Sequence, residues 1–244
     1  MHTESGGLEL VYRVSGIASS GIGLEPMLAQ IISLIAKAVH CDVCIVEESV
    51  AETGGAVLRA SRSPHDAMPA RFDLDAAGCA ASRVSGEGAV VAAERQAGDD
   101  PRFKPVPGFV DGNHQALLSV PLVAGGAVLG AVNAYFRGPL AHTPADVALL
   151  SFAGEQIGMA IAAAAARAEA ARLRESVLKL ESELETRKLV ERAKGILQRD
   201  GGITEEEAYL KLRAESRRTR KPMRELAEAV ILADAASRAA SEGS

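Results

Sequence analysis

Basic side chains are concentrated near the C-terminal end of this 244-residue sequence. Positions 211–224 hold seven Lys or Arg residues and one acid, Glu215, so the stretch carries a local charge of +6 in a chain of net charge -5. The basic residues are Lys211, Arg213, Arg217, Arg218, Arg220, Lys221 and Arg224. Such side chains bind phosphate groups, which supply much of the affinity of nucleic-acid binding. The pattern predicts a phosphate-binding surface, and a solvated helix face is the alternative.

A second basic stretch precedes the first. It comprises Arg187, Lys188, Arg192, Lys194 and Arg199, with Glu191 as the only acid among them. Tyr209 lies one helical turn before Arg213, so an aromatic ring and a guanidinium would share a face on which an unpaired base could stack. Packing of Tyr209 in a core is the alternative. Together these residues extend the predicted nucleic-acid surface over two helices.

Gly195 interrupts the helical pattern of this second stretch. A glycine inside a helix costs about 1 kcal/mol relative to alanine. It allows close approach of another helix or of RNA, or it relieves crowded packing. The sequence leaves these explanations open.

The cysteines and histidines could support other chemistry. Cys41, Cys44 and Cys79 cannot all pair, and a chain of this length needs no disulfide, which predicts thiols in a reducing compartment. Cys41 and Cys44 have the spacing of a metal or redox pair, but they enter a predicted strand, where residues three apart point to opposite faces. Four histidines show no ligand spacing, and we expect each to be a surface or loop residue rather than a haem ligand: His40, His65, His114 and His142. We therefore predict no metal site and no catalytic constellation.

Composition and charge bound the class of protein. The chain is 48% hydrophobic and 24% charged, as in soluble globular proteins, and only 3% aromatic. Its net charge of -5 excludes a histone-like or uniformly basic binder. The first 13 residues lack the basic and apolar segments of a signal peptide, and the Ala-rich run 159–166 is too short to cross a bilayer. We expect a cytoplasmic protein.

The first two thirds of the chain predict a helix and an antiparallel sheet. Apolar residues from Met27 to Val39 recur at helical spacing, and short strands follow at 42–48 and 56–61, joined by a turn at Thr53-Gly54-Gly55. The variable stretch 63–113 is predicted to hold short helices near 76–84 and 101–103 and a strand at 89–92. Strands at 116–123 and 127–137 flank Ala124-Gly125-Gly126, which suits a tight hairpin turn.

A long helix is predicted to begin at Pro144, capped by Thr143. Apolar residues continue in one heptad phase from Leu149 to Leu184, which is typical of a coiled coil. The predicted dimer seam consists of Leu173, Val177, Leu180 and Leu184. Because a helix to about Arg199 would be about 80 Å long, we expect it to join two domains and to pair with a second copy. A helical hairpin within one chain is the alternative.

Three helices are predicted at the C-terminal end. The long helix stops at Gly201-Gly202, and Thr204 and Glu207 form a capping box for a second helix to about Ser216. Pro222 begins a third helix, and we expect a flexible tail after it.

The order of helix, strands, variable middle, strands and helix resembles a GAF domain over residues 16–166. Leu117-Leu118-Ser119-Val120-Pro121-Leu122 and Gly130-Ala131-Val132-Asn133 resemble the signature of its last two strands. The resemblance implies a sensor whose ligand is unknown, since GAF domains bind cyclic nucleotides, tetrapyrroles, other small molecules or nothing known. Some GAF proteins are methionine sulfoxide reductases, so an enzyme with Cys79 or Cys44 as nucleophile is an alternative reading.

The C-terminal residues resemble an ANTAR domain of AmiR and NasR type regulators. The resemblance covers the segment from Leu189 to Leu197, then Thr204 to Tyr209 with Leu212, Arg213 and Ser216, and finally Arg220 to Ala227. It implies a unit that binds paired RNA hairpins in nascent transcripts and prevents a terminator from forming. Other ANTAR proteins carry a receiver domain, but no strand here ends in the acidic pair of a phosphorylation pocket.

These observations predict an α+β protein: a GAF domain with an antiparallel sheet and flanking helices, a long coiled-coil helix and a three-helix ANTAR domain. We expect a flexible N-terminus at 1–15, the GAF sensor at 16–166, a coiled-coil linker at 167–185, the ANTAR domain at 186–236 and a flexible tail at 237–244. The predicted RNA-binding residues are Lys188, Arg192, Lys194, Gly195, Tyr209, Arg213, Arg217, Arg218, Arg220 and Lys221.

The expected partners are RNA hairpin loops, a second copy of the chain and a small-molecule signal in the GAF domain, with no membrane. A DNA-binding or protein-docking transcriptional regulator with the same sensor is the alternative, and neither reading is an enzyme. We expect the replacement of Lys194 and Arg213 by Glu to abolish RNA binding and leave the fold intact.

Overall fold

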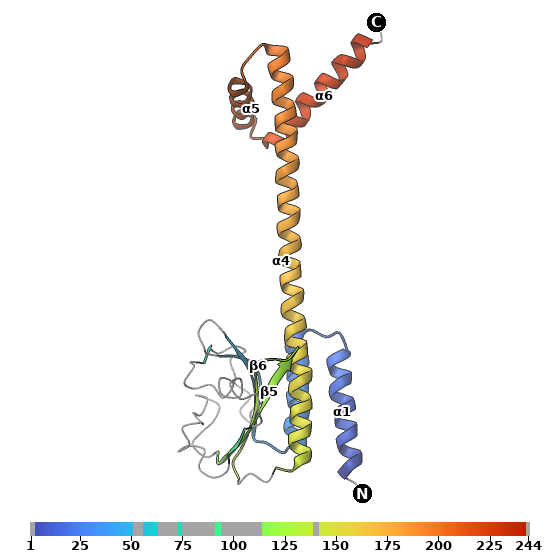
Figure 1. Ribbon diagram of the computed structural model, residues 1–244, viewed down its shortest axis with the longest axis vertical. Helices are drawn as coiled ribbons and strands as arrows, with labels where there is room; N and C mark the ends of the chain where they lie inside the picture. Colours follow the sequence, from blue (N-terminus) through green and yellow to red (C-terminus); the bar gives the residue numbers. More distant parts are fainter. Residues whose placement is uncertain are drawn as a thin grey trace. The chain divides into compact units, whose positions relative to one another are not determined.

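The computed structural model describes residues 3–50, 56–62, 73–74, 91–93, 114–138 and 142–242. The chain divides into two compact units, Met1–Arg167 and Ala168–Ser244. Helix α4, Pro144–Gly201, contributes residues to both (Figure 1). The predicted long helix is therefore present, and it continues two residues beyond Arg199.

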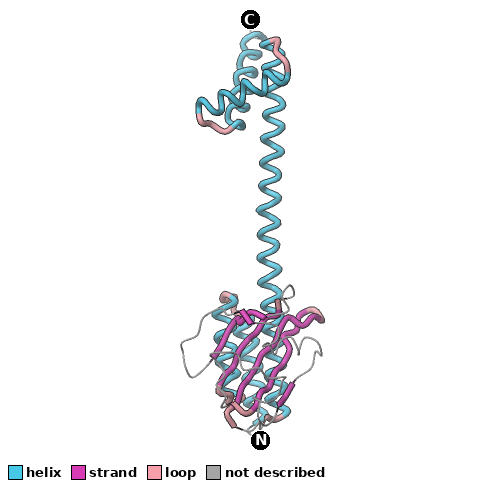
Figure 2. Tube along the Cα trace, turned by 90° about the vertical axis from the view of Figure 1, so that its left-hand side faces the viewer, coloured by secondary structure: helices cyan, strands magenta, loops and turns pink. Residues whose placement is uncertain are grey.

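One antiparallel sheet forms the centre of the first unit. Its strands are β1 Val43–Ser49, β2 Ala56–Arg62, β3 Asp73–Leu74, β4 Val91–Ala93, β5 Ala116–Ala124 and β6 Ala127–Phe136. They lie in the order β3-β2-β1-β6-β5-β4, and every neighbouring pair is antiparallel. Figure 2 shows them as one layer with helices behind it. The predicted fold class and the four longer strands are confirmed.

The hairpin between β5 and β6 turns as the glycines predict. Gly125 and Gly126 have φ values of 58° and 81°, which a residue with a side chain rarely adopts. The turn brings Ser119 opposite Asn133 in the sheet register.

Helix α2, Leu24–Ala38, and the first part of α4 cover one face of the sheet. Apolar residues of α2, α4, β1, β5 and β6 form a continuous core there, including Leu28, Ile32, Val46, Leu118, Val120, Leu150 and Ile157. Gly154 and Gly158 let α4 lie directly on β5, because a Cβ at either position would be 2.6 Å from a carbonyl oxygen of Pro121 or Val123. These contacts fix the position of α4 on the sheet.

The N-terminal segment forms a helix, which corrects our expectation of a flexible N-terminus. Helix α1 spans Thr3–Ser19. Val14 is fully buried, and Leu10, Val11 and Ile17 pack against the same core. Sequence reasoning missed this short apolar stripe because Gly6, Gly7 and Gly16 lie in the same segment and glycine disfavours a helix.

The predicted flexible tail is also largely helical. Helix α6 spans Met223–Glu242, well beyond residue 236. Alanine is the strongest helix former, and residues 235–240 contain four alanines, which explains the extension.

Several predicted features lie outside the described residues. These are the turn at 53–55, the short helices near 76–84 and 101–103, His65 and Cys79. The strand predicted at 89–92 overlaps β4.

One window of 18 residues in α4 passes a test of length and composition for a membrane span, with a mean hydropathy of 1.5. This differs from our expectation that no segment would be apolar enough. Of the window, 39% is buried inside the protein. Residues of this part of α4, such as Ile157 and Ile161, belong to the core beneath the sheet.

We predict that Gly158→Ala destabilises the first unit by about 1–3 kcal/mol, because the added methyl group would overlap the backbone of Val123. Urea unfolding followed by circular dichroism measures the effect. Gly195→Ala is the matched control in the same helix, since no atom of the residues that the structure describes lies within 4 Å of its Cβ position. The control should gain up to about 1 kcal/mol. Equal effects of both substitutions would contradict the packing argument.

Candidate nucleic-acid interface

Three helices build the second unit: the C-terminal part of α4, α5 Glu205–Thr219 and α6 (Figure 1). Ala193, Leu212 and Ala227 form its buried centre. Seven partly buried residues pack around them: Leu189, Val190, Leu197, Met223, Leu226, Val230 and Ile231. This small core holds α5 against α4 and so determines which side chains of α5 face outward.

A capping box fixes the start of α5, as predicted. The backbone N–H of Glu207 donates to Thr204 Oγ1 at 3.3 Å, and the backbone N–H of Thr204 donates to Glu207 Oε2 at 2.8 Å. The backbone N–H and the hydroxyl of Thr204 both donate to Glu207 Oε2, and these two bonds lower the pKa of the Glu207 carboxyl. The helix therefore begins at a defined residue, and the positions along it are set.

The end of α5 is a basic turn with its own hydrogen bonds. Arg220 adopts a left-handed conformation with φ of 56°, unusual for a residue other than glycine. Ser216 Oγ donates to the carbonyl oxygen of Lys221 at 2.6 Å, and Thr219 Oγ1 donates to that of Glu215 at 2.7 Å. The local geometry thus holds the guanidinium-bearing residues of this turn in place.

The predicted basic residues are exposed, with the exception of Lys194. Four make ion pairs with acids on their own helix: Lys188 with Glu185, Arg218 with Glu215, Lys221 with Glu225 and Arg224 with Glu228. Others make no ion pair within the described part of the chain: Arg187, Arg192, Lys211, Arg213, Arg217 and Arg220. We call Arg213, Arg217, Arg220 and Tyr209 the basic face of α5.

Tyr209 belongs to this face rather than to the core. Its side chain is 41% exposed, and Arg213 follows it by one turn on the same side of α5. The helix buries Ala208 and Leu212 instead. An aromatic ring beside an unpaired guanidinium can stack on a base.

Lys194 occupies a different environment from the one its sequence suggested. It is only 7% exposed, and its Nζ donates to Glu205 Oε1 at 2.6 Å and to both carboxylate oxygens of Glu191 at 2.9 Å. The hydrogen bonds to Glu205 and Glu191 raise the pKa of Lys194, and the hydrogen bond from Lys194 lowers that of Glu205. Lys194 therefore ties the start of α5 to α4 and is no part of an open surface. A Lys194→Glu substitution would gather three carboxylates, so the fold is not expected to stay intact.

Gly195 is exposed, and no atom of the described residues lies within 4 Å of the position that a Cβ would take. Crowded packing against the described part of the chain is thus excluded as its reason. Lys188, Arg192 and Arg199 share its side of α4 at spacings of three and four residues. Arg199 pairs with Asp234 of α6.

The predicted seam residues of α4 are all exposed in the single chain. Leu173, Val177, Leu180 and Leu184 keep between 52% and 59% of their surface accessible. No described segment of the chain covers them.

The first unit contains buried polar groups that sequence reasoning missed. Glu47, Ser119 and Asn133 are at most 1% exposed and lie on the sheet face opposite α2 and α4. Ser119 Oγ donates to Asn133 Oδ1 at 2.5 Å, while Asn133 Nδ2 finds no acceptor among the described residues. The only signal in the sequence was the isolated polar residue in each of two otherwise apolar strands, Ser119 in β5 and Asn133 in β6.

The prediction that Cys41 and Cys44 point to opposite faces is wrong. Cys41 precedes β1, so the alternation of the strand does not apply to it. A hydrogen bond with Cys41, together with burial, raises the pKa of the Cys44 thiol. Both cysteines are free thiols, and no group of three metal-ligating side chains occurs among the described residues.

His114 is also buried, 5% exposed, with its ring at a centroid distance of 6.2 Å from that of Tyr135. It is therefore a core residue and not the surface or loop residue that its lack of ligand spacing suggested.

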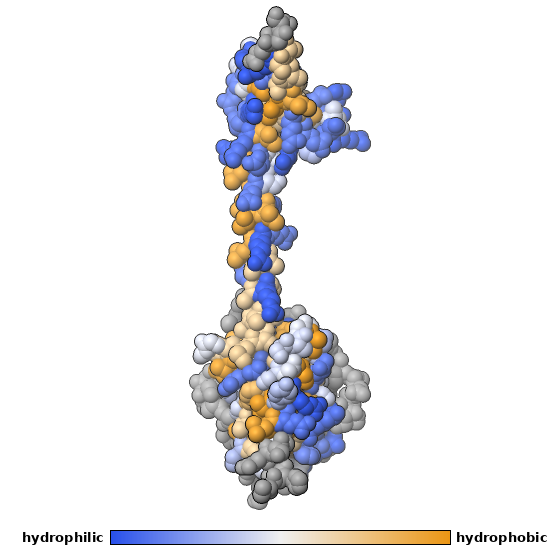
Figure 3. All heavy atoms as spheres, turned by 90° about the vertical axis from the view of Figure 1, so that its right-hand side faces the viewer, coloured by the Kyte–Doolittle hydropathy of each residue, from blue (hydrophilic) through white to orange (hydrophobic). Residues whose placement is uncertain are grey.

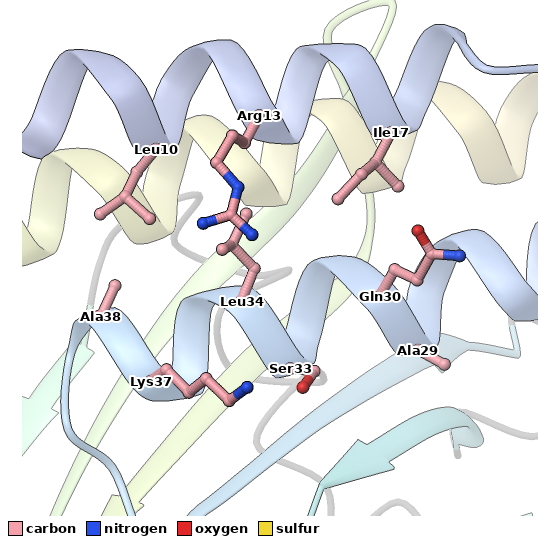
Figure 4. A pocket seen from close by; sticks show the side chains of 9 residues that line it. All are labelled: Leu10, Arg13, Ile17, Ala29, Gln30, Ser33, Leu34, Lys37 and Ala38. Atoms are coloured by element: carbon pink, nitrogen blue, oxygen red, sulfur yellow. The ribbon is translucent and has the colours of Figure 1, made fainter.

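A groove lies between α1 and α2 (Figure 4). Arg13 reaches into it from α1, and α2 contributes Gln30, Ser33 and Lys37. Ser33 Oγ accepts a hydrogen bond from Arg62 at 2.6 Å. The groove depends on α1 and was therefore not predictable from a sequence reading that left this segment flexible.

The comparisons with known families identify both parts of the chain. The GAF domain model matches residues 23–161, and the ANTAR domain model matches residues 178–231. A search of curated proteins finds no match.

Solved GAF domains have the same fold as the first unit. The GAF domain of an Acinetobacter phosphoenolpyruvate-protein phosphotransferase is 21% identical with a TM-score of 0.59, covering 68% of this chain and 97% of its own. That of the Coxiella burnetii protein is 16% identical with a TM-score of 0.59, covering 68% and 99%. The free methionine-R-sulfoxide reductase of Neisseria meningitidis is 12% identical with a TM-score of 0.52, covering 63% and 87%. At these identities the likeness concerns the fold alone.

The ion pairs of Lys194 predict a pH dependence of stability. We compare unfolding free energies of the wild type and Lys194→Met by urea titration. Because the pKa of Glu205 is lowered on folding, the advantage of the wild type should be lost as the pH falls below about 4.5. Because the pKa of Lys194 is raised, the advantage should also be lost as the pH rises above about 10.5.

Lys188→Met is the matched control, since the one ion pair that Lys188 makes within the described part of the chain is an exposed pair at 3.5 Å with Glu185. Its effect on stability should be near zero at every pH. If the difference in unfolding free energy between the wild type and Lys194→Met does not change with pH, the charges of Lys194, Glu191 and Glu205 contribute nothing to stability.

Proposed function

The chain belongs to the GAF family and carries an ANTAR domain at its C-terminal end, and from this premise we propose that it is an RNA-binding transcription antiterminator. Its ANTAR domain would bind paired hairpins in nascent transcripts and prevent a terminator from forming. The GAF domain would control this binding in response to a signal. Both domains are regulatory, and we propose a cytoplasmic, dimeric regulator without enzymatic activity.

The observation that carries this proposal is the basic face of α5. Arg213, Arg217 and Arg220 are exposed and make no ion pair among the described residues, so their charges are available to phosphates. Tyr209 adds a ring on which a loop base can stack. Cations and an exposed aromatic on one helix suit RNA loops better than a duplex, whose bases are already stacked.

Residues of α4 supplement this face. Arg192 is exposed and makes no ion pair with another described residue, and Gly195 leaves the helix surface flat beside it. We propose that the RNA backbone approaches α4 here. Arg218 and Lys221 would exchange their exposed intrahelical pairs for phosphates at little cost, because such pairs contribute little to stability.

We further propose that the signal is a small molecule bound by the GAF domain on the sheet face that carries Glu47, Ser119 and Asn133. The Asn133 amide offers a donor there that needs an acceptor.

The direct test is binding of the purified full chain, at near-physiological salt, to a labelled transcript with two adjacent short hairpins. Duplex DNA of the same sequence is the control. We expect tight binding to the transcript that is lost when one hairpin loop is mutated. Equal binding to DNA would favour the alternative of a DNA-binding regulator, and no binding to either would favour protein docking or a requirement for the signal.

We predict that Arg213→Glu weakens RNA binding at least about tenfold, because a charge in contact with phosphate or base changes sign. Lys179→Glu is the matched control, an exposed charge reversal on α4 outside the basic face. It should leave binding within about twofold of the wild type. The milder Arg217→Gln should reduce the slope of log K against log salt by about one. If Arg213→Glu and Lys179→Glu act alike, the basic face of α5 is not the binding surface.

A further inference from the structure

The groove between α1 and α2 has the dimensions of a ligand site (Figure 4). Its volume is about 620 Å³, within the range of about 300–1,000 Å³ that small-molecule sites occupy. The side of the first unit that carries α1 shows hydrophobic and hydrophilic side chains next to one another (Figure 3). We therefore asked which chemistry the side chains of the groove would recognise.

Helical spacing places the lining residues on two facing stripes. On α1, Leu10, Arg13 and Ile17 follow one another at intervals of three and four residues, so they share one side of the helix. On α2 the same spacing brings four residues to the groove: Gln30, Ser33, Leu34 and Lys37. Each helix therefore contributes one cation, Arg13 from α1 and Lys37 from α2.

The buried side of the groove is apolar. Leu34 is only 8% exposed, and Leu10 and Ile17 are half-buried and pack against the core of the unit. We call these three residues the apolar floor. Figure 4 shows the Arg13 side chain reaching from α1 toward α2. A bound molecule would therefore meet hydrocarbon on its buried side and positive charge on its exposed side.

The two cations have no acidic partner among the described residues. Arg13 and Lys37 are exposed and make no ion pair with any residue that the structure describes. None of the nine described residues that line the groove is acidic. Two positive charges on opposite walls repel each other, and an anion between them would replace this repulsion by attraction. The groove therefore favours a negatively charged ligand.

Ser33 supplies a neutral donor between these charges and the sheet. Its Oγ accepts a hydrogen bond from Arg62 Nη1 at 2.6 Å, and its carbonyl oxygen accepts a longer one from the same nitrogen at 3.4 Å. Because Oγ accepts from Arg62, the hydroxyl hydrogen is left to donate to a ligand. Strand β2 thus places a third positive charge, that of Arg62, one hydrogen bond away from the groove.

The donors of the groove suit a carboxylate better than a phosphate. Phosphate sites in proteins commonly use backbone N–H groups at helix N-termini. The lining residues lie inside α1 and α2, where the backbone N–H groups already bond to carbonyl oxygens of the same helix. Only side-chain donors remain, and the two oxygens of a planar carboxylate match the fork of the Arg13 guanidinium.

We infer that the groove between α1 and α2 binds a small organic carboxylate with a hydrocarbon body. The carboxylate lies between Arg13 and Lys37 and accepts a hydrogen bond from Ser33. The hydrocarbon body lies on the apolar floor. The polar residues of the ligand site proposed above are on the opposite face of the sheet, so the groove is a second site of the first unit. It does not depend on RNA binding.

A ligand in this groove would hold α1 against α2, because its carboxylate contacts one cation from each helix. A molecule that binds only the docked helices stabilises the docked state. The backbone amides of α1 should therefore exchange more slowly with solvent deuterium when the groove is occupied. Exchange that slows elsewhere in the chain and not in α1 would contradict the assignment of the groove.

Calorimetric titration of the full chain with sodium octanoate at neutral pH tests the inference directly. Octanoate is ionised under these conditions and carries a hydrocarbon chain. We expect saturable binding in the millimolar range or below. Octanol lacks the charge and acetate lacks the hydrocarbon chain, so each is a matched probe. Both should bind at least about tenfold more weakly than octanoate.

Substitutions of the two cations locate the site. Arg13→Gln and Lys37→Met should each weaken octanoate binding at least about tenfold, because each removes a charge that contacts the carboxylate. Arg13→Lys keeps the charge and should retain more of the affinity than Arg13→Gln. Arg174→Gln removes an exposed cation of α4 that does not line the groove, and it should leave the affinity unchanged. Circular dichroism of each variant verifies that the fold is kept.

Each part of the inference can be overturned separately. Octanol that binds as tightly as octanoate would overturn the recognition of charge, and tighter binding of octyl phosphate would overturn the choice of a carboxylate. Octanoate binding that survives both Arg13→Gln and Lys37→Met would overturn the location. No binding of octanoate up to about 10 mM would overturn the site itself. The hairpin-binding assay is a separate measurement, so the proposed function and this site can fail independently.

Discussion

The unbroken backbone hydrogen bonding of α4 is the constraint on which both units depend. The helix contributes Leu150 and Ile157 to the core beneath the sheet, and Ala193 and Ile196 are buried near its other end. No proline interrupts it, and the glycines within it are tolerated for different reasons: contact with β5 at Gly154 and Gly158, and open space at Gly195. A break in this one helix would therefore remove the fixed connection of the seam residues Leu173–Leu184 to the core of either unit.

Charge is arranged along α5 in a way that serves both stability and binding. Glu205, Glu206 and Glu207 occupy the first turn, and Arg217 and Arg218 the last, which matches the helix dipole at both ends. The same arrangement keeps most of the acids away from the basic face. Lys194 adds to this by neutralising Glu205 from α4. The positive charge of the unit is thereby concentrated at the end of α5 and the turn that follows it.

Local signals in the sequence were sufficient for much of the fold. The capping box of Thr204, the cap of Thr143 and the glycine turn of β5 and β6 each involve residues within three positions of one another. The role of Lys194 could not be predicted, because it depends on Glu205 from a second helix. The thiol pair was misjudged since the strand begins two residues later than Cys41. Helix α1 was missed because its stability comes from packing against α2 and the core.

The continuity of α4 also has a consequence for changes in chain length. Each residue added to an α-helix turns everything beyond it by about 100°. One residue inserted between Leu184 and Leu189 would therefore rotate the core-forming side of the ANTAR part away from its angle to the seam. Seven inserted residues would restore that angle to within about 20°. Variation in the length of this segment is thus expected to be tolerated in steps of a heptad. The helix therefore sets the angle between the seam and the core-forming side of the ANTAR part, as well as the distance between them.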